Sequence, residues 1–361
     1  MKRAPLPILV RLLRDPALAA GLALADWDLA LRQATSTNLT PSLLALLEEH
    51  GLLEQVPAQP RAHLEWVRAL ALRHRQAVRF EVECIQEALG ADAAPLVLLK
   101  GAAYAMAGLH AGAGRLFADI DILVPKARLD TVESALMLHG WASTHHDAYD
   151  QRYYRQWMHE LPPMQHVRRR TSIDVHHAIL PETAPVRPDP DKLRAAALPI
   201  EGAPGLATLA PADMVLHSAV HLFFDGEFDK GLRDLLDLHR LFQEFGPRPG
   251  FWEALPARAR ELELGRPLFY ALRYCRRLYA TPVPATVLDA VAPLGPNRVL
   301  RALMDALFER ALLPLHASCG DAFSPAARFA LYVRGNWLRM PPLLLAKHLF
   351  HKALISREQV P

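Results

Sequence analysis

Two aspartates about one third of the way along the chain, Asp119 and Asp121, are spaced so that their carboxylates could bind the same ligand. They belong to the run DIDILV at residues 119–124, which is typical of a strand. Alternate side chains of a strand leave the same face, so both carboxylates project together while Ile120 and Ile122 point into a core. Adjacent carboxylates repel each other unless a cation or a shared proton lies between them. The pair therefore favours a site for a divalent ion.

A second group of residues, upstream of this pair, has the character of an anion site. The apolar run LVLL at residues 96–99 predicts a buried strand, and Lys100 and Gly101 follow it directly. A helix expected over residues 101–109 would offer free backbone N–H groups and the positive end of its dipole to phosphate oxygens. Lys100 could add a point charge to a phosphate, although an isolated lysine at a strand end is by default an exposed residue.

These residues resemble the signature of the nucleotidyltransferase superfamily, which includes DNA polymerase beta and the aminoglycoside nucleotidyltransferases. The resemblance rests on Lys100-Gly101-Ala102, Arg115 and Asp119-Ile120-Asp121. Within the superfamily it points to uncharacterised bacterial members that carry Leu-Lys-Gly in place of the usual Gly-Gly or Gly-Ser, and it covers roughly the middle third of the chain. Two departures stand out. Ala102 replaces a phosphate-binding serine, and residues 103–118 form a longer spacer than is common.

The resemblance implies a metal-dependent enzyme that moves an NMP from an NTP to a hydroxyl acceptor and releases pyrophosphate. The acceptor would be a small molecule, a protein side chain or an RNA end. The superfamily has a third carboxylate on a later strand, and Asp174 in the run TSIDVHH at residues 171–177 supplies a candidate. The implied catalytic and metal-binding residues are thus Asp119, Asp121 and Asp174. Their hard oxygen ligands favour Mg²⁺ or Mn²⁺ over zinc, with two ions bound.

A second set of residues would neutralise the triphosphate. The predicted nucleotide-binding residues are Lys100, Gly101, Ala102, Arg115 and His176. The forked donors of arginine suit a phosphate and a carboxylate such as Asp119 equally well, so the role of Arg115 stays open. His176 shares a strand face with Asp174, and it could orient that carboxylate, contact a phosphate or simply hydrogen-bond within the fold.

Two alternative functions use the same residues. One is a non-catalytic nucleotide-binding or scaffold protein with this fold, for which Ala102 is the best support. The other is a metal-dependent phosphohydrolase. Three retained carboxylates favour an enzyme over a scaffold, because an unused acidic cluster is costly to keep folded.

Two further histidines, His217 and His221, are four residues apart on a predicted helix. That spacing lets two imidazoles share a metal ion, but the glutamate of the pattern His-Glu-x-x-His is absent. We interpret them as structural histidines that line the nucleotide cleft.

The composition places the chain among globular proteins. Its 361 residues suggest two or three structural units, and a composition of 51% hydrophobic and 22% charged residues favours a globular over a disordered chain. The net charge of +3 is too slight to predict nucleic acid as a partner. Cys84, Cys275 and Cys319 have no metal-type spacing, and their small, odd number fits a reducing compartment. The oligomeric state stays open.

The sequence predicts neither a membrane-spanning segment nor an export signal. No apolar run reaches the roughly 20 residues of a membrane span, and the basic N-terminus lacks the long apolar stretch of an export signal. A basic amphipathic helix expected at residues 343–354 could lie on a membrane surface, but such a helix more commonly closes a core. We therefore expect a cytoplasmic protein.

The overall pattern predicts an α+β fold, helical for the most part, with a small mixed sheet flanked by helical regions. The predicted organisation is an N-terminal helical region at 1–90, the catalytic core at 91–180, a proline-rich connector at 181–211 and a C-terminal helical domain at 212–361. The connector is expected to be extended, with a short helix near residues 191–197.

Some elements are defined well enough to compare with a structure. Leu and Ala at three- and four-residue intervals predict a long helix at 62–89 and a short one at 129–138. A hairpin is predicted with arms at 164–167 and 172–178. Residues 141–157 are polar and aromatic without a clear period, so they predict no element.

Overall fold

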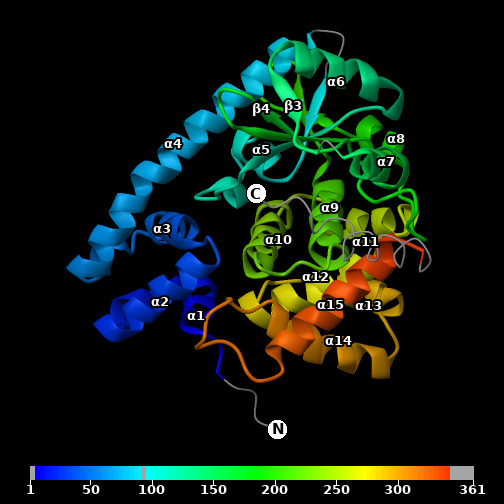
Figure 1. Ribbon diagram of the computed structural model, residues 1–361. Helices are drawn as coiled ribbons and strands as arrows, with labels where there is room; N and C mark the ends of the chain where they lie inside the picture. Colours follow the sequence, from blue (N-terminus) through cyan, green and yellow to red (C-terminus); the bar gives the residue numbers. More distant parts are fainter. Residues whose placement is uncertain (1–4, 91–94, 146, 342–361) are drawn as a thin grey trace.

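The protein consists of many helices around one seven-stranded mixed sheet (Figure 1). The computed structural model describes residues 5–90, 95–145 and 147–341. This architecture confirms the predicted α+β class with a predominance of helix. The helix predicted at 343–354 lies outside the described residues. None of the described helices combines the length and apolar character that crossing a membrane requires.

The sheet has the strand order β3-β4-β5-β2-β1-β7-β6. β1 runs antiparallel to β2, whereas β2 runs parallel to β5 on its other side. The predicted hairpin is present as the antiparallel pair of β4 and β5. The strands are β1 (Leu96–Leu98), β2 (Asp119–Leu123), β3 (Trp141–Ser143), β4 (Met164–His166), β5 (Ser172–His176), β6 (Leu198–Pro199) and β7 (Leu206–Thr208).

Two segments contribute elements that the sequence did not predict. The stretch at 181–211, predicted to be an extended connector with a short helix, holds α8 (Pro190–Ala195) but also β6 and β7, and β7 pairs in parallel with β1. The unassigned stretch at 141–157 forms β3 and α7 (Ala148–Trp157). Strands of two or three residues are too short to show an alternating pattern, which explains why they were missed.

The N-terminal helices lead into the sheet through one long helix, α4 (Ala58–Leu89), which runs along the side of the molecule in Figure 1. The helix packs against α3 at its start and against α5 and α6 further along. It ends at Gly90, whose positive φ of 67° is the left-handed conformation that glycine adopts without strain. The remaining helices of this half are α1 (Ile8–Arg14), α2 (Leu24–Ser36), α3 (Thr40–Glu49), α5 (Lys100–Met106) and α6 (Leu129–Leu138).

Four C-terminal helices, α10, α11, α12 and α15, pack against α9, which is buried along nearly its whole length. A single hydrophobic core continues from Ile8 through the sheet to Leu331, so the helical regions and the sheet share one interior. The C-terminal helices are α9 (Pro211–Phe224), α10 (Gly231–Phe245), α11 (Phe251–Glu261), α12 (Gly265–Tyr279), α13 (Ala285–Val291), α14 (Arg298–Ala311) and α15 (Ser324–Arg339).

Buried ionic contacts attach the loop before β2 to helix α10. Arg115 Nε donates to Asp237 Oδ2 at 2.7 Å, and both side chains are more than nine-tenths buried. Arg240, one turn further along α10, donates to the carbonyl oxygens of His110 and Ala113 in the same loop. Because these groups lie away from water, the pairing fixes the loop and with it the start of β2.

We expect Arg115→Met to lower the free energy of unfolding by about 3 kcal/mol, because the buried Asp237 carboxylate loses its partner. Urea denaturation followed by circular dichroism measures this change. The control is Lys126→Met, which breaks an exposed ion pair with Glu182 and should cost less than about 1 kcal/mol. Unchanged stability of Arg115→Met together with weaker nucleotide binding would instead support the phosphate contact predicted for this arginine.

Candidate active site

The parallel pairing of β2 and β5 places Asp121 directly opposite Asp174. Donor atoms of Asp121, Asp174 and His176 all lie within 4.8 Å of one another. The two carboxylates thus come together although they are far apart in the sequence. Asp119, two residues before Asp121 on β2, lines the same cleft as Asp174 and His176.

Asp121 is the buried centre of this group. Its Oδ1 accepts from Lys100 Nζ at 2.9 Å and lies 2.9 Å from His176 Nε2. Burial alone would raise the pKa of Asp121, but the Lys100 ammonium and the His176 imidazole outweigh it and hold that pKa well below its usual range. Asp121 is therefore ionised, and Asp121 in turn raises the pKa of Lys100 against the effect of burial.

Asp174 has the opposite electrostatic environment. Burial, followed by the charge of Asp121, raises the pKa of Asp174 to about 7. Near neutral pH, Asp121 is thus charged and the neighbouring Asp174 is half protonated. This difference in protonation is typical of two acids that share one site.

The cleft in front of these residues has a volume of about 350 Å³ and lies between the sheet and the ends of α9 and α15. Helix α9 and the residues just after it provide His217, His221 and Asp225, so both histidines line the cleft as interpreted from their spacing. Asp225 accepts from Arg339 of α15 at 3.0 Å and lies 3.0 Å from His221 Nδ1. The lining from α15, which the sequence did not point to, comprises Tyr332, Asn336 and Arg339.

Lys100 has a backbone conformation that is uncommon for its residue type. Its φ is +44°, in the left-handed region, at the first residue of α5. Such a conformation costs on the order of 1 kcal/mol or more and persists where the surroundings impose it. Here the side chain ends at Asp121 inside the cleft, so the lysine is not the exposed strand-end residue that is the default interpretation.

The other predicted nucleotide-binding residues occupy different surroundings. Gly101 and Ala102 are buried, and a Cβ on Gly101 would lie 2.2 Å from Arg115 Nη1, so this glycine makes room for the arginine. Arg115 pairs with Asp237 and not with Asp119, because the loop turns its guanidinium towards α10. Of the five predicted residues, Lys100 and His176 are the two in the described lining of the cleft. The nucleotide contacts of the other three stay predictions.

Two cleft residues, His159 and Glu160, had no signal in the sequence. They precede β4 in irregular chain, and backbone pairing holds them beside β5, with His177 N donating to His159 O at 2.8 Å and an isolated bridge joining Glu160 to His176. Glu160 Oε2 lies 3.2 Å from His176 Nδ1. Burial raises the pKa of Glu160 and lowers the pKa of His159 well below its usual value.

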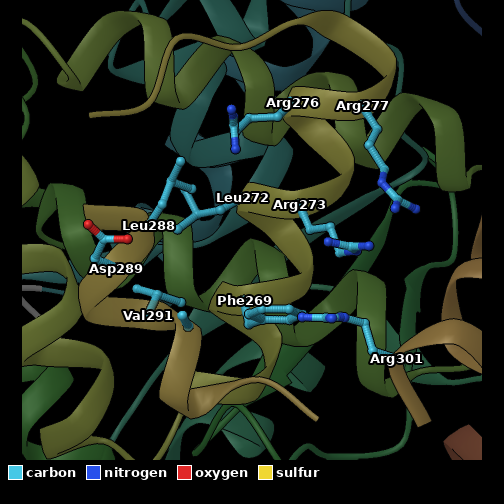
Figure 2. A pocket seen from close by; sticks show the side chains of 10 residues that line it. Phe269, Leu272, Arg273, Arg276, Arg277, Leu288, Asp289, Val291 and Arg301 are labelled. Carbon is cyan, nitrogen blue, oxygen red and sulfur yellow. The ribbon is translucent and has the colours of Figure 1, made fainter. Parts of the chain in front are cut away.

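A second cavity, of about 480 Å³, lies among helices α12, α13 and α14 (Figure 2). Four arginines surround it, and two of them are paired, because Arg273 and Arg277 both donate to Asp305. Its described lining holds a single carboxylate, Asp289. This cavity lacks the paired acids of the cleft, so it is not a candidate for the same chemistry. Its arginines are Arg273, Arg276, Arg277 and Arg301.

Comparison with known proteins agrees with the geometry of the cleft. No individually curated protein gives a significant match to the chain. A family model described as "Uncharacterised nucleotidyltransferase" matches residues 23–280, which include the sheet, the carboxylates and helix α9 but not α15. Because this match covers well over half of the chain, the protein belongs to this family of uncharacterised nucleotidyltransferases.

Proposed function

We propose that the protein transfers a nucleoside monophosphate from an NTP to a hydroxyl group, with release of pyrophosphate, in a reaction that depends on Mg²⁺ or Mn²⁺. The observation that carries this proposal is the register of β2 and β5, which sets the buried Asp121 beside Asp174, while Asp174 and Asp119 line the cleft. Membership of the family supports transfer of a nucleotide. Three free cysteines fit a reducing compartment such as the cytoplasm.

The residues of the cleft fit a divalent cation. Burial, together with the charge of Asp121, keeps Asp174 partly protonated, and a cation between the two carboxylates would remove their repulsion. Asp119, Asp121 and Asp174 would hold the ion or pair of ions through oxygen, the donor that Mg²⁺ and Mn²⁺ prefer. When bound, such ions neutralise charge on the attacking hydroxyl and on the leaving pyrophosphate.

The side chains of the cleft then have separate tasks in the transfer. The acceptor oxygen attacks the α-phosphorus as the bond to the β-phosphate oxygen breaks, and pyrophosphate leaves. Asp174, directly opposite Asp121 and at the cleft, would help to remove the hydroxyl proton. His176 orients Asp121 through its Nε2. Lys100 lines the cleft, where its ammonium would contact the triphosphate.

We expect Asp121→Asn and Asp174→Asn each to reduce transfer by at least about 100-fold, because each removes a metal-binding charge with little change in volume. The assay supplies each α-labelled NTP with Mg²⁺ or Mn²⁺ and follows pyrophosphate release and label on the protein or on lysate components. Asp130→Asn on the exposed side of α6 is the matched control and should retain wild-type activity.

The products of the same assay separate the alternatives. Label on an acceptor with free pyrophosphate supports transfer. Free nucleotide and phosphate would indicate a phosphohydrolase, and no turnover of any NTP would indicate a non-catalytic nucleotide-binding or scaffold protein. Wild-type activity in a folded Asp121→Asn protein would refute the assignment of the site.

The raised pKa of Asp174 predicts a pH dependence of stability in the absence of metal. An unfolded aspartate has a pKa of about 4, so between about pH 4 and pH 7 the folded protein retains a proton that the unfolded chain releases. This group therefore stabilises the fold most at low pH, and its contribution is lost as the pH rises through about 7. Urea midpoints in EDTA should show wild type losing stability relative to Asp174→Asn over this range. A constant difference would contradict the assignment.

Lys100 and a metal ion should compete for Asp121. We expect Lys100→Met to bind Mg²⁺ about tenfold more tightly than wild type without nucleotide, since the competing ammonium is gone, and to show a higher KM for the NTP. Calorimetric titration and steady-state kinetics measure the two effects. Lys192→Met, which breaks an exposed ion pair with Glu261, should change neither. Weaker Mg²⁺ binding by Lys100→Met would contradict this competition.

A further inference from the structure

Two imidazole nitrogens in the cleft are buried without a hydrogen-bond partner, His159 Nδ1 and His176 Nδ1. His176 is only 3% exposed, so water does not satisfy it. A buried polar atom without a partner costs roughly 1–3 kcal/mol, and such atoms are rare in folded proteins. His159 Nδ1 therefore requires an explanation, and so does His176 Nδ1, which has only the misaligned carboxylate of Glu160 beside it.

The two imidazoles and Glu160 lie close together. Donor atoms of His159, Glu160 and His176 all lie within 4.8 Å of one another, and the two ring centroids are 5.3 Å apart. Glu160 Oε2 lies 3.2 Å from His176 Nδ1, yet the angles do not form a hydrogen bond. Ligands of a tetrahedral zinc ion, each about 2.0–2.1 Å from the metal, lie about 3.4 Å from each other. The spacing of this pair thus matches two ligands of one ion.

We propose that His159, Glu160 and His176 bind a divalent transition-metal ion such as Zn²⁺, at a site separate from the carboxylates of the proposed transfer reaction. Zinc accepts two neutral imidazole nitrogens together with one carboxylate, whereas Mg²⁺ does not favour nitrogen ligands. The three residues line the open cleft, which gives an ion a path of entry and leaves room for a further ligand.

The remaining contacts of His176 support this assignment. Its Nε2 lies 2.9 Å from Asp121 Oδ1, so the ring donates there and leaves the Nδ1 lone pair for a metal. A carboxylate that orients a metal-binding histidine through its second nitrogen is a recurrent arrangement in metal sites. His159 is held in place independently, through its carbonyl oxygen, which accepts from His177 N at 2.8 Å. An ion bound here would therefore fix the imidazole that orients Asp121.

Calorimetric titration of the metal-free, full-length protein with ZnCl₂ tests the proposal. We expect one binding site in wild type, weakened at least about 100-fold in His159→Gln and in Glu160→Gln. His217→Gln, a buried imidazole in the same cleft but outside the proposed set, is the matched control and should bind Zn²⁺ as wild type does. Zinc should also raise the melting temperature of wild type but not of the two ligand variants.

The Mg²⁺ titration separates this proposal from the proposed function. Asp174→Asn should lose Mg²⁺ binding and keep Zn²⁺ binding, whereas Glu160→Gln should do the reverse. Wild type that binds no Zn²⁺, or Zn²⁺ binding that persists in folded His159→Gln and Glu160→Gln proteins, would overturn the zinc site and leave the transfer reaction untouched. If His159→Gln does not fold, by circular dichroism, Glu160→Gln decides alone.

Discussion

The arrangement of the cleft depends on the register between β2 and β5. This register sets the largely buried carboxylates of Asp121 and Asp174 opposite each other. Two unit charges less than 5 Å apart repel by on the order of 3 kcal/mol at an effective dielectric constant of 20. Burial of Asp174 and, after it, this repulsion raise the pKa of Asp174 to about 7. The fold compensates the remaining charge, on Asp121, with Lys100 and His176.

The surrounding elements hold these compensating groups in position. Lys100, the first residue of α5, contacts Asp121 from a left-handed backbone conformation just after β1, and β1 itself lies between β2 and β7. The start of β2 is held from the other side, where Arg115 joins the preceding loop to Asp237 on α10. The sheet and the helical regions thus depend on each other, which is consistent with the hydrophobic core that they share.

The sequence predicted those parts of the fold in which apolar residues recur at regular intervals. Alternation at 119–124 identified β2 and the common face of its two aspartates, and the helices α4 and α6 follow the predicted spacing of Leu and Ala. The sequence could not predict the partners of Lys100 and Arg115, because an ion pair between distant residues leaves no periodic signal. The roles of Glu160 and His159 were missed for a related reason, since both lie in irregular chain that tertiary contacts alone place beside β5.

His176 contacts a carboxylate of the proposed transfer reaction and also belongs to the proposed zinc site. Its Nε2 hydrogen-bonds to the ionised Asp121, while its Nδ1 faces Glu160. A positively charged imidazole has a proton on Nδ1 and therefore has no lone pair there for a metal ion. Glu160 and Asp121 raise the pKa of His176 against the effect of burial, which favours the charged ring when no metal is bound. A metal at Nδ1 would displace that proton, keep the positive charge beside Glu160 and leave the hydrogen bond to Asp121 in place. The proton carries one positive charge and the ion two, so the ion would add positive charge beside the carboxylate pair while Asp121 keeps its hydrogen bond from Nε2. The arrangement can therefore accommodate an ion at His176 and retain the ionised Asp121.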